Sequence, residues 1–358
     1  MRTMLRSHVV GVAVAGLLVI LIGGAGWGAP APENFGGEQL VVTIPGGKQE
    51  DDFTRLAFQP FEKLYNAKIS IVEGSTFDIL AKLRAQRANP QIDVWTMAEP
   101  GPVIARDEKL VEPMTVADVP NLAKLIPAAQ WNRLPDGSYP FVDVELTAIA
   151  VGYNPNFAHT VPTSWNQLAD PMYKGHLLMP NMNVAAGVVL LVVLARVNGG
   201  SERNIDPGFA AAAKVRQNAI TLWSSHDQVA TMLTQGTAWL TVESVDRLGP
   251  LNRSGAPINI DYPQDGVVAI GNSMGISAGT RHKKLAERLL NYLLAPEQQS
   301  ALSAAGIFFP PVAGVRMSPQ VSYYFPPYVM KKAIALDWEQ IAQHADVWQE
   351  RWNKEIVK

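Results

Sequence analysis

Residues 139–154 read YPFVDVELTAIAVGYN, an extended run of apolar and β-branched residues that holds two acids, Asp143 and Glu145. Residues of this kind favour strands, and strands in globular proteins are usually about 5–6 residues long. A strand as long as this one can pass from one lobe of a protein into another. The stretch therefore predicts a chain with two lobes that share a crossing strand.

Upstream of this stretch, short apolar strands alternate with helices. Gly46 and Gly47 follow the first strand, and Gly74 with Ser75 and Thr76 follows the second. Strands that are joined by helices in this way run parallel and carry helices on both faces of their sheet. The predicted elements are a strand at 40–44, a helix at 51–65, a strand at 69–72, a helix at 77–88 and a strand at 92–96.

Downstream of the stretch, the same alternation begins again with its own apolar pattern. A strand from Val267 to Ile270 and two helices at 283–294 and 296–305 then lead the chain back toward the first lobe. Between the long stretch and Val267, the predicted elements are strands at 177–179, 220–223 and 238–242 and helices at 184–197, 209–217 and 228–233. The chain is thus expected to leave the first lobe, build a second one and return.

This order predicts an α/β protein in which each lobe is a doubly wound, mostly parallel sheet. We expect lobe 1 to comprise residues 38–148 plus 267–318, and lobe 2 to comprise residues 149–266 plus 319–358. Two or three crossing strands would form a hinge, and the cleft between the lobes is then the expected ligand site. Ligands of such sheets bind beyond the carboxyl ends of the strands.

The first 29 residues have the three parts of a secretory signal peptide. Arg2 and Arg6 precede an apolar stretch from Val9 to Ile22, and small residues follow it. The apolar stretch is shorter than the ~20 residues that span a bilayer, which favours cleavage over anchoring. Residues 1–29 are therefore expected to be a cleaved signal peptide, and the mature protein is expected in the periplasm.

The composition excludes several classes of function. The 358 residues contain no cysteine, which rules out a thiolate nucleophile, a disulfide, an iron–sulfur cluster and a lipid anchor on an N-terminal cysteine. The net charge of -2 leaves no basic excess for nucleic acid. The six histidines are scattered without metal-ligand spacing. We expect no cofactor, no metal and no nucleic-acid partner.

Several segments resemble the type II extracellular solute-binding proteins of ABC importers, in the branch that includes binders of polyamines, iron and phosphonates. The most specific are AVGYNPN (150–156) and VPTSWNQLADPMYKGHLLMPN (161–181), which are similar to the family's crossover strand, Pro-x-Ser-Trp-x-x-Leu helix and Asp-Pro-x-Tyr-Lys-Gly turn. The others are LRAQRANPQIDVWTM (83–97), GTAWLTVES (236–244), PQDG (263–266) and LLNYLLAPEQQSALSAAGIFFPP (289–311).

The resemblance implies a two-lobed binding protein of the type II periplasmic class, and not an enzyme. Such a protein captures a small solute between its lobes and delivers it to an ABC permease in the inner membrane. We expect a monomer.

The candidate ligand-binding residues lie in or beside the ends of the predicted strands. Carboxylates interleaved with aromatic rings suit a cationic amine, through ion pairs and cation–π contacts. Glu145 and Glu243 stand out because each lies in or just after an apolar strand, where an unpaired charge is costly. The full candidate set is Gly47, Lys48, Ser75, Thr76, Glu99, Glu145, Thr147, Trp223, Glu243, Ser244, Tyr262, Asp265 and Asn272.

An organic amine or polyamine-like cation is the ligand that this set favours, and two other ligands stay open. Lys48, Ser75, Thr76 and the loop 181–187 could hold an anion such as a phosphonate, since helix N-termini attract anions. Ferric iron is the other. Iron binders that the chain resembles use paired tyrosines near the hinge, and the adjacent pair here, Tyr323 and Tyr324, falls late in the chain.

An alternative outside this class is a secreted serine hydrolase. Residues 271–275, GNSMG, match the G-x-S-x-G nucleophile elbow and would make Ser273 the nucleophile. The elbow requires a strand that turns at once into a helix, whereas residues 276–280 read as extended chain or loop. The motif is also short enough to arise by chance.

Overall fold

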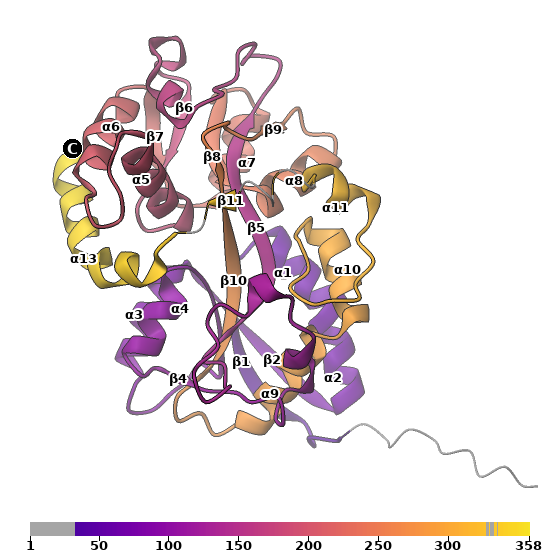
Figure 1. Ribbon diagram of the computed structural model, residues 1–358. Helices are drawn as coiled ribbons and strands as arrows, with labels where there is room; N and C mark the ends of the chain where they lie inside the picture. Colours follow the sequence, from indigo (N-terminus) through magenta and orange to yellow (C-terminus); the bar gives the residue numbers. More distant parts are fainter. Residues whose placement is uncertain (1–32, 327–328, 330–332, 335) are drawn as a thin grey trace, which may run out of the picture. The chain divides into compact units, whose positions relative to one another are not determined.

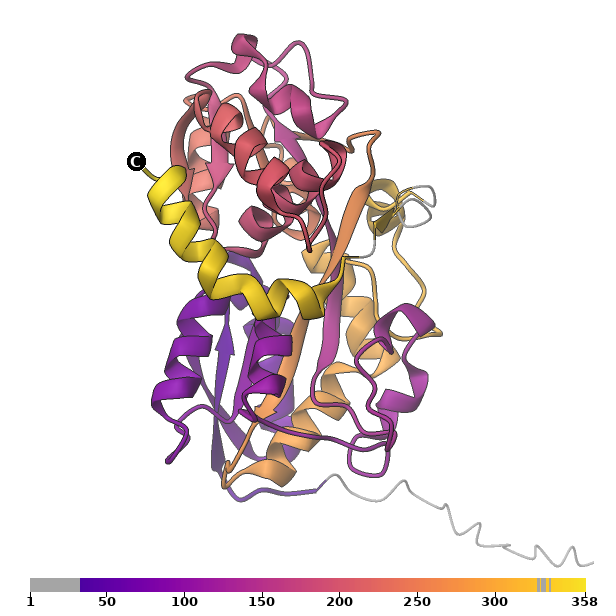
Figure 2. The same cartoon turned by 60° about the vertical axis from the view of Figure 1, so that its left-hand side comes forward.

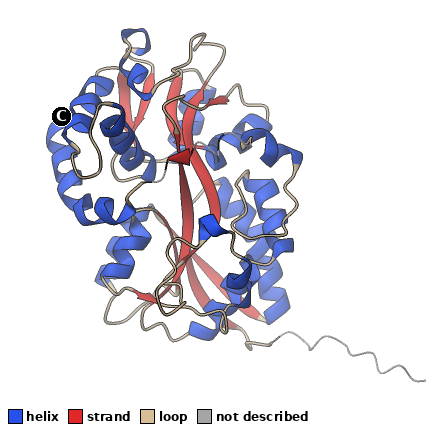
Figure 3. Ribbon diagram, viewed as in Figure 1, coloured by secondary structure: helices blue, strands red, loops and turns tan. Residues whose placement is uncertain are grey.

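The computed structural model of the chain describes residues 33–326, 329, 333–334 and 336–358 (Figure 1). The predicted signal peptide lies outside these residues. Strands of both lobes form one mixed sheet with the order β2-β1-β3-β10-β5-β8-β6-β7. Figure 3 shows these strands with helices on both sides of them.

Two long strands connect the two halves of this sheet. β5 (Val142–Tyr153) runs antiparallel to β10 (Val267–Ser277), and the two pair from Val142 to Ile149 of β5. Beyond this point β5 pairs with β8, while the far end of β10 pairs with β3. The long strand predicted at 139–154 is therefore confirmed as a crossing strand, and β10 is the second one.

The first lobe is built around β1 (Glu38–Ile44), which pairs in parallel with β2 (Ala67–Glu73) and β3 (Val94–Ala98). Parallel strands need a connection that crosses the sheet, and the helices between them supply it. These helices are α1 (Lys48–Phe53), the π-helix η1 (Thr54–Phe58), α2 (Gln59–Tyr65), α3 (Thr76–Ala85) and α4 (Gly101–Asp107).

The second lobe repeats this arrangement around β6 (Leu177–Pro180), which pairs in parallel with β7 (Ala219–Trp223) and β8 (Leu240–Ser244). Its central helix α5 (Ala185–Val197) is apolar along almost its whole length and buried among the others. The remaining helices are α6 (Asp206–Arg216), α7 (His226–Thr234) and α8 (Val245–Arg253), and β9 (Asn259–Asp261) pairs with β5.

After β10 the chain returns to the first lobe through α9 (Lys283–Leu293) and α10 (Pro296–Gly306). The last helix, α13 (Trp338–Glu355), packs against α4 of the first lobe and α6 of the second (Figure 2). The short elements are β4 (Val111–Glu112), η2 (Pro120–Lys124), η3 (Pro127–Ala129), η4 (Trp165–Ala169), η5 (Pro171–Tyr173), α11 (Pro319–Tyr324) and β11 (Ala333–Ile334).

The predicted α/β fold is confirmed, with two differences in detail. The two parallel sheets are joined into a single sheet, because β5 and β10 pair with both of them. β10 continues to Ser277, seven residues beyond the predicted strand end at Ile270. The exact lobe boundaries, 38–148 plus 267–318 and 149–266 plus 319–358, stay a prediction, and α13 contacts both lobes.

Candidate functional site

Two adjoining pockets lie between the lobes, beyond the ends of the strands. They enclose about 700 and 570 Å³ and share four side chains of the second lobe, those of His226, Glu243, Asp246 and Arg247. We call the first one the acidic pocket; besides the shared residues it is lined mainly by Lys48, Gln49, Asp52, Phe53, Glu145, Asp227, Leu248, Leu251, Leu302 and Phe308. We call the second one the helix-end pocket; it is lined mainly by Ser75, Thr76, Thr147, Val184, Ala185, Ala186, Trp223, Ser244 and Asn272.

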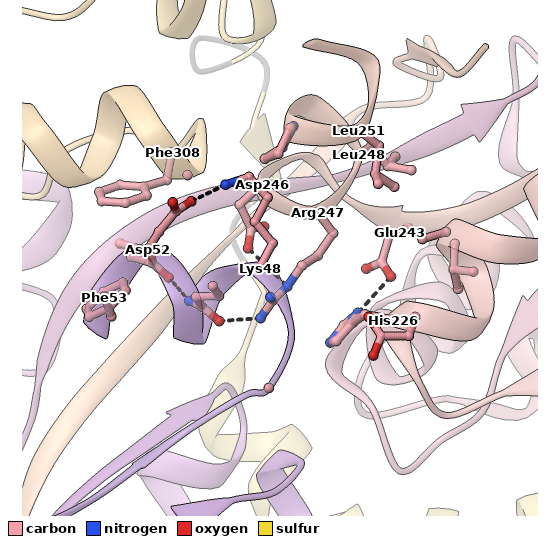
Figure 4. A pocket seen from close by; sticks show the side chains of 18 of the residues that line it. Lys48, Asp52, Phe53, His226, Glu243, Asp246, Arg247, Leu248, Leu251 and Phe308 are labelled. Carbon is pink, nitrogen blue, oxygen red and sulfur yellow. Dashed lines mark hydrogen bonds and ion pairs between the residues drawn. The ribbon is translucent and has the colours of Figure 1, made fainter. Parts of the chain in front are cut away.

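Carboxylates dominate the acidic pocket. Five of its lining side chains are acids, against the two cations Lys48 and Arg247. Lys48 is partly neutralised already, because its Nζ lies 2.8 Å from Asp52 Oδ2. Figure 4 shows Asp246 and Arg247 of α8 facing Lys48 and Asp52 of α1. Apolar side chains, among them Phe53, Leu248 and Phe308, line the pocket as well. The pocket therefore combines acids with apolar side chains, as an organic cation requires.

A β-bulge directs Glu145 into this pocket. The register of β5 against β10 shifts between Asn272 and Ser273, so that Glu145 lies opposite Asn272 while Asp143 lies opposite Ser273. Neighbouring residues of a strand face opposite sides of the sheet, and the bulge therefore sends the two acids to opposite faces. Glu145 lines the cleft, whereas Asp143 is buried behind it.

Neutral groups are the hydrogen-bond partners of the Glu145 carboxylate. The amide of Asn272 donates to Glu145 Oε2 at 2.9 Å, and the amide of Gln49 donates to the same oxygen. Burial, followed by repulsion from Asp246, raises the pKa of Glu145 to about 8. Among the described residues, no cation is hydrogen-bonded to this buried acid.

Asp246 is the second carboxylate of the site, in the first turn of α8. It is 8% exposed, and its Oδ1 has no hydrogen-bond partner among the described residues. Its Oδ2 lies 3.5 Å from Nε of Arg247, a long ion pair. Buried polar atoms normally have partners, so an unpartnered carboxylate oxygen beside two pockets indicates a place for a ligand donor.

His226 and Glu243 form a pair on the border between the pockets. His226 Nδ1 lies 2.8 Å from Glu243 Oε2, and the backbone N–H of Ser244 donates to Glu243 Oε1 at 2.7 Å. Both oxygens of Glu243 are therefore occupied. Glu243 positions the imidazole, whose other nitrogen is left for the cleft.

The helix-end pocket adds donors to the two acids, Glu243 and Asp246, that it shares with the acidic pocket. The N-terminus of α5 borders it, with no side-chain cap and no acid in the first turn of the helix. Trp223 also lines this pocket, and its Nε1–H, which is buried, has no partner among the described residues. Free N–H groups at a helix N-terminus attract anions. This pocket therefore suits an anionic group.

Most of the residues predicted from sequence meet at the cleft. Gly47 borders an outer pocket of the cleft, next to Asp227. Those that line the acidic or the helix-end pocket are Lys48, Ser75, Thr76, Glu145, Thr147, Trp223, Glu243, Ser244 and Asn272. Thr76 and Thr147 also have structural bonds, since Thr76 Oγ1 accepts from Ala98 N at 3.1 Å and Thr147 Oγ1 accepts from Asp246 N at 3.2 Å.

Besides Gly47, three predicted residues lie outside both pockets. Asp265 accepts a hydrogen bond from Trp165 N at 2.9 Å and fixes a turn. Tyr262 lies in a separate surface pocket with Tyr323 and Tyr324, and its hydroxyl donates to the Tyr324 carbonyl. The tyrosine pair considered for iron is therefore beside Tyr262 and not in the cleft lining.

Glu99, the third of these, belongs to a buried cluster with Asp143 and Ser273. It accepts from Gly271 N at 2.9 Å, while Ser273 Oγ donates to Asp143 at 2.6 Å. Burial and repulsion from Asp143 raise the pKa of Glu99 well above its usual value, and burial raises that of Asp143 to about 6. The cluster joins β3, β5 and β10 and does not line either pocket.

The nucleophile elbow considered as an alternative at 271–275 does not form. Ser273 lies within β10, is fully buried and hydrogen-bonds to Asp143. The two glycines of the motif have packing roles. A Cβ on Gly271 would lie 2.3 Å from Asp143 Oδ1, and one on Gly275 would lie 2.1 Å from the ring of Trp95.

The sequence analysis missed several residues of the site, above all Gln49, His226, Asp246 and Arg247. Asp246 and Arg247 directly follow β8, in the first turn of α8. The strand-end rule that selected Glu243 and Ser244 would have found them if it had been extended by one helical turn.

Among the described residues, no helix has the length and apolar character that a membrane span requires. The same part of the chain contains no group of three or more His, Asp or Glu side chains arranged to hold a metal ion.

The chain belongs to the bacterial extracellular solute-binding protein family, which it matches over residues 57–326. It is 25% identical, over 336 residues, to the "Putative 2-aminoethylphosphonate-binding periplasmic protein" of Salmonella typhimurium, covering 91% of this chain and 94% of the relative. It is also 25% identical to the spermidine/putrescine-binding periplasmic protein of Escherichia coli, over 54% of this chain and 55% of that protein.

A solved structure with a similar fold is the periplasmic binding protein AfuA from Actinobacillus pleuropneumoniae. Its TM-score is 0.76 at 19% identity, over 89% of this chain and 98% of that one. The family and the fold identify the chain as the solute-binding component of an ABC transporter, of the periplasmic class. It is a transport component and not an enzyme.

Proposed function

We propose that the cleft binds a small organic amine that also carries a phosphonate-type anion, so that the solute is an aminophosphonate or a close analogue. The observation that carries this proposal is the buried Asp246 Oδ1, which has no hydrogen-bond partner among the described residues. An ammonium group placed between Asp246 and Glu145 would supply the missing donor and the missing charge. Charge-assisted hydrogen bonds of this kind are about twice as strong as neutral ones.

The helix-end pocket supports the anionic half of the ligand. The uncapped N-terminus of α5 and the Nε1–H of Trp223 could donate to a phosphonate there. Arg247 borders both pockets and could bind the anion with its guanidinium group. The Salmonella relative is named for 2-aminoethylphosphonate, a molecule that carries both groups two carbons apart.

A polyamine-like cation, as the sequence favoured, is the alternative that the acids of the first pocket keep open. A diamine could place both ammonium groups among the acids of the first pocket, but it would leave the donors at the N-terminus of α5 unused. For this reason we favour the zwitterion. Ferric iron and a purely anionic solute have less support in the cleft, because neither would use the unpartnered Asp246 oxygen as an ammonium group can.

Residues 1–29 would carry the chain to the periplasm and be removed there, as the sequence predicts. The mature protein would act as a monomer and pass its solute to a permease in the inner membrane.

Isothermal titration calorimetry with three small molecules tests the ligand. 2-Aminoethylphosphonate should bind, and ethylphosphonate and putrescine, which each lack one of the two groups, should bind at least about tenfold more weakly. Asp246→Asn should lower the affinity for 2-aminoethylphosphonate by about ten- to a hundredfold, since a hydrogen bond to a charged group contributes about 1.5–3 kcal/mol.

Asp346→Asn is the matched control, because Asp346 is exposed on α13. It should leave the affinity unchanged. Tighter binding of putrescine than of 2-aminoethylphosphonate, or an Asp246→Asn variant with wild-type affinity, would contradict the proposal.

A further inference from the structure

Gln49 connects the two sides of the cleft through one amide group. It lies in α1 of the first lobe, and its Nε2 donates to Oε2 of Glu145, on the crossing strand β5. Its Oε1 accepts from Nη2 of Arg247, which belongs to α8 of the second lobe. The Gln49 side chain therefore hydrogen-bonds to Glu145 and to Arg247 at the same time.

A second contact next to Gln49 brings the same two edges together. Gly47 has a φ of 72°, a backbone conformation that favours glycine, and a Cβ added there would lie 3.1 Å from Oδ1 of Asp227 in α7. The loop before α1 thus packs closely against the start of α7. Both contacts join α1 and its loop to the second lobe.

We propose that Gln49 is a latch that holds the solute-free cleft closed, and that the ammonium group of the solute displaces its amide from Glu145. The first half of the proposal concerns the free protein alone. The second half rests on the proposed amine ligand.

The chemistry of the exchange favours the solute. The Gln49 amide gives Glu145 a neutral N–H donor, whereas an ammonium group gives a charged one in a buried, acidic site. When the Gln49 side chain leaves, Arg247 also loses its partner on Oε1 of Gln49. Its guanidinium group then becomes available for an anion in the adjoining helix-end pocket.

This coupling makes Gln49 a specificity-determining residue. A solute with an amine alone would replace Gln49 at Glu145 but would leave Arg247 without the acceptor that it had. A solute with both groups replaces both bonds. The latch therefore favours zwitterions over simple amines, without itself contacting the anion.

Small-angle X-ray scattering of the solute-free protein tests the latch directly. The radius of gyration of Gln49→Ala should exceed that of the wild type. Gln49→Glu, which replaces the amide donor by a carboxyl group, should show the same expansion. Gln59→Ala is the matched control, because Gln59 is exposed at the start of α2. It should match the wild type. Equal radii for all four proteins would overturn the latch, whatever the ligand proves to be.

Stopped-flow tryptophan fluorescence with 2-aminoethylphosphonate tests the displacement. Wild-type association should level off with rising solute concentration, because the cleft must open first. Gln49→Ala should associate about tenfold faster, as expected when the hydrogen bond from the charged Arg247 no longer joins the two lobes. Its preference for 2-aminoethylphosphonate over ethylamine should fall.

Identical rates and preferences in Gln49→Ala and wild type would overturn the displacement. If 2-aminoethylphosphonate does not bind at all, the proposed ligand fails, while the scattering result still decides the latch. Circular dichroism melting shows whether each variant is folded. If one of Gln49→Ala and Gln49→Glu is unfolded, the other one is used in both experiments.

Discussion

Glu145 is the residue whose environment most opposes its charge in the free protein. Its pKa is raised to about 8 from an ordinary value of 4.5, chiefly by burial. Between these two values the folded protein holds a proton that the unfolded chain has released. The contribution of Glu145 to the free energy of unfolding is therefore largest below about pH 4.5. It is lost as the pH rises from there through about 8, by at most about 1.4 kcal/mol per pH unit.

Glu145→Gln should flatten this fall, because a neutral amide replaces the titrating group. Urea unfolding at several pH values between 5 and 8.5 gives the slope. Part of it should persist, since the pKa of Asp143 is raised to about 6 by burial and acts in the same direction. Glu350→Gln, on the exposed face of α13, should keep the wild-type slope. An unchanged slope in Glu145→Gln would refute this role.

The choice between Glu145 and Glu99 shows what sequence reasoning could not decide at the scale of residues. Glu99 directly follows a strand, whereas Glu145 lies within one. Asp143 and Glu145 are two residues apart, which in a regular strand places them on one face. The bulge opposite Asn272 and Ser273 separates them. It depends on how two distant strands pair, which the apolar pattern of neither strand reveals.

At the scale of elements, most helices and strands were predictable because their apolar periodicity is undisturbed. α8 was missed, and Asp246 and Arg247 were missed with it. This helix contains Gly249 and Pro250, residues that usually mark a turn, and Pro250 lies inside the helix. Leu248 packs in the core of the second lobe, and this burial offsets the low helix propensity of Gly249 and Pro250. Tertiary contacts therefore override the local signal here.

α13 is the element that packs on both lobes, and its loss should be costly. Trp352 is fully buried in the core of the second lobe, whereas Ala345 packs in the core around α3 and α4. Trp352→Ala should lower the free energy of unfolding by about 3–5 kcal/mol, through lost burial and the cavity left behind. Val347→Ala, on the exposed face of the same helix, should change it by less than about 0.5 kcal/mol. Urea unfolding of both variants measures the difference, and equal midpoints would refute the packing role of Trp352.

At the scale of the whole described body, one sheet serves both lobes, and this limits how they can move. β5 and β10 are paired with each other and with a strand of each lobe. Their backbone groups are thus bonded whether or not a solute is present. The cleft can therefore open or close only if these two strands twist and if new contacts form across it. These contacts would form at the facing edges of the cleft, where α1, α5 and α8 begin. The sequence indicated the crossing strand, but the facing edges depend on contacts between residues up to about 200 positions apart, such as Gln49 and Arg247.

Hydrogen exchange should therefore report the solute at helix ends and not in the crossing strands. With 2-aminoethylphosphonate present, the first-turn amides of α5, including Ala185 and Ala186, should exchange up to about 100-fold more slowly when the free solute is about 100 times its Kd. Amides of β5 should change little, because β10 and β8 already accept their hydrogens. Putrescine, which has no anionic group, should not protect α5 even where it binds. Protection that is confined to β5, or that putrescine reproduces at α5, would show that the anion does not bind at the N-terminus of that helix.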